Sequence, residues 1–173
     1  MDTRSVGAPS RRKIGVAAAS TLCAAALLLT APLTHAANGG APQSFTDVQY
    51  AVIQPDSPGG CPFAVSWTAT GAGKTIAAPN GLTLSISPRL NVTVTNLSDP
   101  TKSVVLNATG AFHQTTDNGV TTTVVTGRNL LTDPQAGMVL ALGTFSFAFD
   151  AAGNLVQPLS GTGQLVNVCD LIA

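Results

Sequence analysis

The chain has 173 residues, of which 45% are hydrophobic and only 9% are charged, and its formal net charge is zero. This length fits a single domain, and the neutral balance excludes a strongly basic nucleic-acid-binding protein. Every acidic residue is an aspartate, so glutamate, a good helix former on exposed faces, is absent, and the composition favours β structure.

Residues 1–36 have the pattern of a secretory signal peptide. Positive charges end at Lys13, an apolar stretch follows over residues 14–33, and Thr34-His35-Ala36 supplies small residues at a cleavage site. A retained transmembrane anchor is the alternative, since about 20 apolar residues can span a bilayer. Pro32 and the small residues before Ala37 favour cleavage. We therefore expect cleavage near Ala36, no retained membrane anchor, and a protein that is secreted or associated with the cell wall.

Cleavage would change the charge and the cysteine count. About 137 residues would remain, with four cations and seven aspartates, a formal net charge of −3. Cys61 and Cys169 would remain as an even pair in an oxidising compartment, and such a pair predicts one disulfide. By restricting the unfolded chain, this bond would contribute about 4 to 5 kcal/mol to stability.

The mature chain reads as a flexible leader, residues 37–44, followed by a single β-domain, residues 45–173. In the domain, short runs alternate apolar and polar residues with a period of two, and turn residues separate them. The runs are 63–68, 82–87, 90–95, 103–109, 112–115, 120–125, 138–149 and 164–168. About 8 to 10 short strands without helical periodicity predict an antiparallel β-sandwich, with a closed or partly open β-barrel as the alternative.

One run changes phase. The apolar residues of 138–149 are even-numbered before Gly143 and odd-numbered after it. A glycine at a phase change predicts either a β-bulge or a corner at which a strand passes between sheets.

The mature chain offers little for catalysis. His113 is its only histidine, and no nucleophile elbow accompanies it. Four aspartates lie in Asp-Pro, Asp-Asn-Gly or Asp-x-x-Gly motifs, where the short carboxylate caps turn N–H groups; they are Asp99, Asp117, Asp133 and Asp150. We therefore expect no catalytic residue, no metal and no cofactor, and an Asp-based hydrolase is only a third possibility.

Three residues are candidates for ligand binding. Arg128 lies in an otherwise apolar run, which predicts a half-buried guanidinium paired with an aspartate, or else a ligand anchor. Tyr50 is the aromatic residue least committed to a core pattern, and His113 is the remaining candidate. Trp67 and the three phenylalanines at 145, 147 and 149 follow core patterns, with a sugar-binding platform as the alternative.

Two motifs carry a resemblance. The segment Thr126-Gly127-Arg128-Asn129-Leu130-Leu131 and the closing Gly161-Thr162-Gly163-Gln164-Leu165-Val166-Asn167-Val168-Cys169-Asp170 resemble small secreted actinobacterial proteins of unassigned function. The resemblance covers residues 63–173 and implies an exported β-domain with a bridged terminal cysteine, but no activity. We expect a non-catalytic module, binding or structural, with a cell-envelope polysaccharide or a protein as partner and no nucleic acid. The main alternative is a small β-barrel that carries an apolar ligand.

Overall fold

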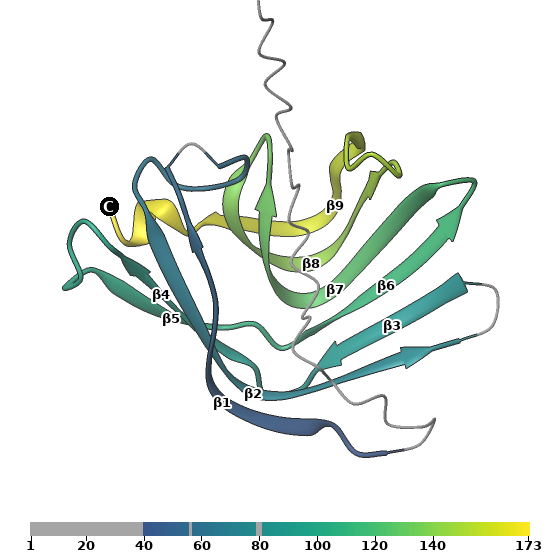
Figure 1. The fold of residues 1–173 in the computed structure, drawn as a ribbon, viewed down its shortest axis with the longest axis horizontal. Helices are drawn as coiled ribbons and strands as arrows, with labels where there is room; N and C mark the ends of the chain where they lie inside the picture. The colour runs from purple at the N-terminus through teal and green to yellow at the C-terminus, as the bar shows by residue number, and fades with distance from the viewer. Residues whose placement is uncertain (1–39, 56, 79–80) are drawn as a thin grey trace, which may run out of the picture.

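The structure, a computed structural model, describes residues 40–55, 57–78 and 81–173, and the expected signal peptide lies outside these ranges. The described chain forms nine β-strands and one short 3-10 helix, η2 (Figure 1). The elements are β1 (Gln43–Ile53), β2 (Val65–Ala77), β3 (Leu82–Ser87), β4 (Asn91–Asn96), β5 (Ser103–Asn107), β6 (Gly110–Asp117), β7 (Val120–Asp133), β8 (Gly137–Phe149), β9 (Leu155–Asn167) and η2 (Cys169–Leu171).

The strands form one antiparallel sheet in the order β5-β4-β2-β3-β6-β7-β8-β9, with β1 paired to the other edge of β2. β3 and β4 lie end to end along β2. β6 and β5 also lie end to end, with β6 paired to β3 and β5 paired to β4. The predicted all-β antiparallel fold is therefore confirmed. Within the described ranges, β9 and β1 each pair with a strand on one side only, so the sheet is not closed into a barrel.

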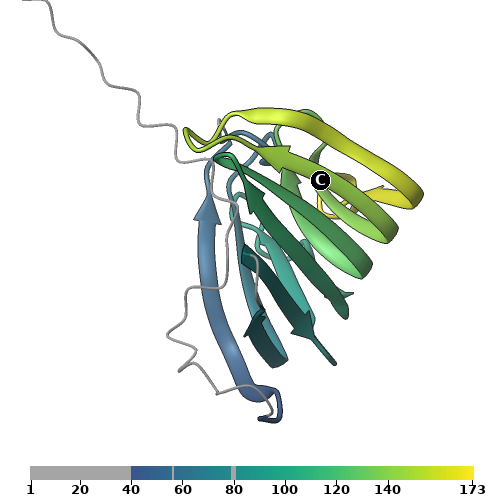
Figure 2. The ribbon, with the colours of Figure 1, turned by 90° about the vertical axis from the view of Figure 1, so that its right-hand side faces the viewer.

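The sheet forks where β5 and β7 separate. β6 pairs with β7 as far as Gly127, and the backbone N–H of Arg128 donates to the carbonyl of Thr109 at 3.0 Å, but β5, which continues the line of β6, does not pair with β7. The strands β4 and β5 and the first part of β2 then pack against the ends of β7, β8 and β9 (Figures 1 and 2). The core between these two layers contains Val65, Ala69, Val92, Val94, Leu106, Met138, Leu140, Val168 and Ile172.

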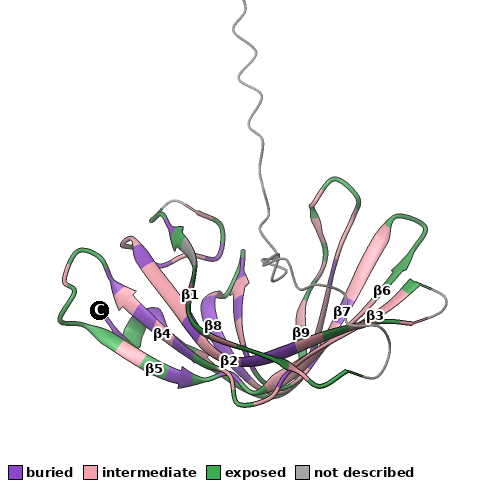
Figure 3. Ribbon diagram, turned by 60° about the horizontal axis from the view of Figure 1, so that its bottom comes forward, coloured by how far each residue is buried: buried purple, intermediate pink, exposed green. Residues whose placement is uncertain are grey.

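The fork divides the molecule into two parts. The stapled half comprises β1, β4, β5, η2 and residues 65–70, 128–133, 137–142 and 164–167 of the long strands. The outer arm comprises β3, β6 and residues 74–77, 120–126, 144–149 and 155–162, which form a single layer of strands. Figure 3 shows buried residues gathered in the stapled half, whereas the ends of β3, β6 and β7 are mostly intermediate or exposed.

A row of glycines crosses the sheet where the two parts meet. Gly110 is the register partner of Gly127, Gly127 of Gly143, and Gly143 of Gly163. At Gly143, where φ is +141°, a Cβ atom would lie 2.2 Å from the carbonyl oxygen of Thr162. Only glycine allows such an approach of two backbones. We call this row the glycine crease, because β7, β8 and β9 bend along it (Figure 1).

Of the two alternatives predicted at Gly143, the β-bulge is wrong, and the strand turns a corner there instead. β8 keeps its register with both β7 and β9 through Gly143, and the register shifts lie farther along, between Ser146 and Phe149. β8 bends at the glycine but stays within one sheet. The change of phase in the sequence arises because residues 138–141 are buried on both faces. Val139 and Ala141 belong to a second core cluster on the opposite face of β8, together with Phe145.

Two boundaries also differ from the sequence prediction. β1 begins at Gln43, two residues before the expected start of the domain, and its irregular pairing with β2 explains why no alternation marks it. β9 runs through Gly161 and Gly163, where the sequence predicts a strand only over 164–168. These glycines belong to the bend of the sheet and not to a turn.

Candidate functional site

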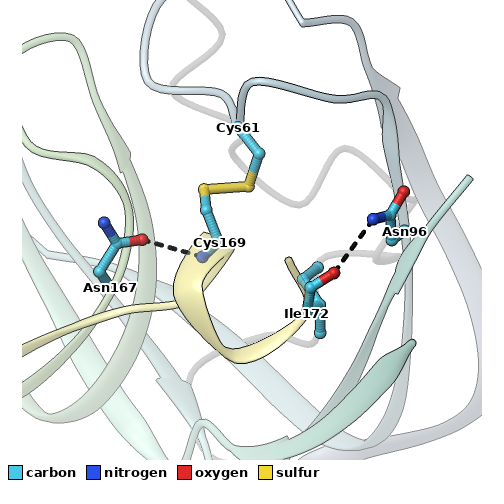
Figure 4. Close-up of a disulfide and its surroundings, with 5 residues drawn as sticks. All are labelled: Cys61, Asn96, Asn167, Cys169 and Ile172. Atoms are coloured by element: carbon cyan, nitrogen blue, oxygen red, sulfur yellow. Dashed lines mark hydrogen bonds between the residues drawn. A yellow bond between two sulfur atoms is a disulfide. The ribbon is translucent and has the colours of Figure 1, made fainter. Parts of the chain in front are cut away.

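The predicted disulfide between Cys61 and Cys169 is present, with a Cα–Cα distance of 5.4 Å (Figure 4). Both cysteines are buried, and Asn167 fixes η2 by accepting the backbone N–H of Cys169 at 2.9 Å. The Nδ2 group of Asn96 donates to the carbonyl of Ile172 at 3.0 Å. The bond and its neighbours therefore hold the last turn against β4 and the segment before β2.

Three of the four aspartates in turn motifs, Asp99, Asp133 and Asp150, cap backbone N–H groups as the sequence predicts, whereas Asp117 accepts from the side-chain amide of Asn118. Asp150 Oδ1 accepts from Ala152 and Asn154 at 2.9 and 2.8 Å, and Asp133 Oδ1 accepts in the same way from the two residues that follow Pro134. The side-chain amide of Asn154, followed by its backbone N–H, holds the pKa of Asp150 below its usual range. The hydroxyl and backbone N–H of Thr101 lower the pKa of Asp99.

Arg128 is not the half-buried, aspartate-paired residue that the sequence predicts, and the alternative of a ligand anchor stays a prediction. The side chain is exposed, and within the described part of the chain its guanidinium makes no hydrogen bond or ion pair. The buried polar residue of this motif is its neighbour Asn129, which is 2% exposed and donates from Nδ2 to the carbonyl of Thr126 at 3.0 Å. The reason is the fork, since β7 has no partner strand on this side after Gly127 and Arg128 reaches solvent there.

His113 lies in the middle of one face of the outer arm. It is the register partner of Leu84 on β3 and of Val124 on β7, so the three side chains lie side by side on the same face. This row extends over six strands as Ile76, Leu84, His113, Val124, Ser146 and Ser160. The two rows beside it are Lys74, Ile86, Ala111, Thr126, Thr144, Thr162 and Leu82, Thr115, Thr122, Ala148, Gln157. We call these three rows the His113 face.

The His113 face changes character across the arm. On β2 and β3 its side chains are half-buried and, apart from Lys74, aliphatic, whereas on β8 and β9 they are hydroxyl and amide groups apart from the buried Ala148. Gln157 donates from Nε2 to Ser146 Oγ at 3.0 Å, which orders the polar side of the face. The ammonium of Lys74, at the opposite edge, donates to the carbonyl of Gly40. Apart from Lys74, the face therefore presents mainly aliphatic groups on one side of the imidazole and mainly uncharged polar groups on the other.

Of the three candidate ligand residues, Arg128 and His113 do not lie together. Arg128 lies four residues from Val124, the partner of His113, a separation of about 13 Å along an extended strand. Tyr50 lies on β1, beside β2, and its side chain is outside the described part of the structure. Asp117 ends β6 four residues after His113, so the carboxylate is also about 13 Å along the strand from the imidazole.

The aromatic residues fit the core interpretation. Trp67 and Phe63 pack against the core of the stapled half, and Phe147 packs against the second cluster. The rings of Phe147 and Phe149 meet edge to face, with centroids 5.8 Å apart. The signal that sequence reasoning missed is the alternation of β3, β6 and β7 on their second face, which assembles the His113 face.

In the described residues, no three His, Cys, Asp or Glu side chains are grouped so as to hold a metal ion, and no helix there is long and apolar enough to cross a membrane. Comparisons of the chain with models of protein families, with characterised proteins and with solved structures find no match.

Proposed function

We propose that this protein is an exported, non-catalytic module of the extracellular space or cell envelope that binds a neutral polysaccharide on the His113 face. The observation that carries the proposal is the division of the fold. One half is a closed, disulfide-linked core, while the other half is one layer of strands that leaves a broad face in contact with solvent.

The chemistry of the face fits an uncharged ligand. Hydroxyl and amide groups such as Ser146, Ser160 and Gln157 donate and accept hydrogen bonds with sugar hydroxyls. Aliphatic side chains such as Leu84 and Val124 offer apolar surface beside them. The only cation of the face, Lys74, is already bonded to Gly40.

Export is supported by the disulfide and by the N-terminal sequence. A buried disulfide is typical of proteins that fold in an oxidising compartment. Production of the full chain in an exporting host tests this part, because N-terminal sequencing of the exported protein should find the chain beginning after Ala36. An exported protein that still begins at Met1 would contradict it.

The binding proposal is tested by co-sedimentation of the exported protein with isolated envelope polysaccharide. Ser146→Lys places a long charged side chain in the middle of the His113 face, and we expect affinity to fall at least about tenfold. Val105→Lys is the matched control, because Val105 is 67% exposed on β5, outside this face. Equal binding by both variants would exclude the face, and no sedimentation of the unmodified protein would exclude the polysaccharide.

A further inference from the structure

β9 presents an unpaired strand edge. It is the last strand in the sheet order, and in the described chain only β8 pairs with it. The backbone N–H of Val168 donates to the carbonyl of Met138, and alternation then turns the backbone groups of Gly161, Gly163 and Leu165 away from β8. Figure 2 shows β9, in yellow-green, along the outside of the sheet. Its outer N–H and C=O groups are therefore available to another strand.

The edge is protected over one part only. Natural edge strands are protected from pairing by charges, proline and bulges. The first part of β9 has Pro158 and two register shifts against β8, but residues 160–167 keep a regular register and contain no proline. β9 has no charged residue, and its Val156 and Leu165 are 52% and 43% exposed. An uncharged edge with exposed aliphatic side chains favours another β-strand as the partner.

The register of β9 is symmetric about its middle. On β8, Phe149 and Ala141 lie four residues on either side of Phe145, and Ala148 and Leu142 lie three residues on either side. The β9 partners of these five residues, in the order 149, 148, 145, 142 and 141, are Leu155, Gln157, Gly161, Gln164 and Leu165. When positions are counted along β8, the leucines and glutamines of β9 therefore lie at equal distances on both sides of Gly161. Counted along β9 itself, the distances differ because of the two register shifts.

This symmetry suits a second copy of the same chain. A twofold axis between two identical antiparallel strands must pass through a residue that faces its own copy. Gly161 meets this requirement, because its backbone groups point outward and it has no side chain. Pairing about Gly161 sets residues 162–165 of each copy against residues 155–160 of the other. β8 already pairs with residues 155–160 despite Pro158 and the two register shifts. If the second copy repeats these shifts as β8 does, Leu165 lies opposite Leu155 and Gln164 opposite Gln157. Apolar groups then meet apolar groups, and amides meet amides.

We propose that two copies of this protein pair antiparallel through their β9 edges, with the twofold axis at Gly161, so that the two outer arms form one continuous sheet. The proposal does not depend on the polysaccharide proposal, since it concerns the free protein.

Sedimentation and light scattering of the exported protein over about 1 to 100 µM test the association, a range that covers micromolar dissociation constants. We expect a dimer at the upper end. Leu165→Lys should shift the midpoint at least about tenfold toward monomer, because it places a charge at the paired edge. Val105→Lys, on the opposite edge strand β5, should leave the midpoint unchanged. A monomer over the whole range, or equal effects of both variants, would overturn the proposal.

Cysteine pairing tests the register. Ser160 and Thr162 are exposed and face Ser146 and Thr144, so the proposed axis places Ser160 opposite Thr162 of the second copy. A mixture of Ser160→Cys and Thr162→Cys proteins should form a mixed disulfide faster than either protein forms its own. Cross-linking that is equal in all three samples would contradict this register.

Discussion

The stapled half and the outer arm belong to one sheet but differ in how they are stabilised. In the stapled half two layers enclose a core that includes Val65, Val94 and Met138, all fully buried, and the Cys61–Cys169 bond joins its ends. The arm has one layer, and its side chains are mostly half-buried. Because buried apolar area supplies most of the folding free energy, the stapled half stabilises the molecule and the arm depends on it. The difference separates the part that maintains the fold from the part that is free to bind.

Removal of the disulfide gives the largest expected effect. The Cys61→Ala/Cys169→Ala double variant should lose about 4 to 5 kcal/mol of unfolding free energy, since the bond closes a loop with a sequence separation of 108 residues. Denaturant titration measures the loss. A loss below about 1 kcal/mol would mean that the two layers hold together without the bond.

The glycine crease is the next target. Gly143→Ala should cost about 3 kcal/mol or more, because the new Cβ meets the carbonyl of Thr162 and the backbone is left-handed. Gly119→Ala is the control. Gly119 also has a positive φ, of +78°, but its nearest neighbour would be the Cβ of Ala151 at 3.7 Å, so we expect a cost of only about 1 kcal/mol. Equal costs would show that the bend does not require a close approach of strands.

The same substitution in the two parts compares their packing directly. Val94→Ala, at a side chain with no exposed surface in the stapled half, should lower the unfolding free energy by about 2 kcal/mol. Val124→Ala, at a half-buried site in the arm, should cost less than about 1 kcal/mol. Thermal or denaturant unfolding of both variants checks the order, and a reversed order would contradict the division into core and arm.

Acid pH should give the smallest effect and should not distinguish the two parts. Asp99 in the β4–β5 turn and Asp150 in the β8–β9 turn both have a lowered pKa in the folded protein. Their contribution to stability is therefore complete above the ordinary aspartate pKa of about 3.9 and is lost as the pH falls through the lower folded value. Asp150→Asn should reduce the loss of stability between about pH 4 and pH 2. A stability profile that is unchanged in this variant would show that the turn hydrogen bonds do not favour the charged carboxylate.

Several features of the fold follow from local sequence. Alternation predicts β3, β4 and β8 nearly to the residue, and the Asp-Asn-Gly segment predicts the β6–β7 hairpin. The disulfide follows from the count of two cysteines, Cys61 and Cys169, that lie outside the expected signal peptide. These signals are local or compositional, so they need no knowledge of which strands meet.

Other features depend on contacts between distant residues. Burial on both faces of residues 138–141 produces the phase change that suggests a bulge at Gly143, and Arg128 is exposed only because β5 separates from β7. Alternation indicates which side chains of one strand share a face, but it does not show that six strands lie side by side and bring these residues into the rows of the His113 face.

The sequence alone determines the class of this protein. Alternating residues, turn motifs, aspartates without glutamate and one cysteine pair specify antiparallel strands joined by a disulfide, because each of these signals acts over a few residues or through composition. The tertiary structure decides where the sheet forks, which part of β8 is buried on both faces and which strand edge stays unpaired. These properties follow from the approach of backbones at the glycine crease and from the packing of two layers, and both join residues that are far apart in the chain.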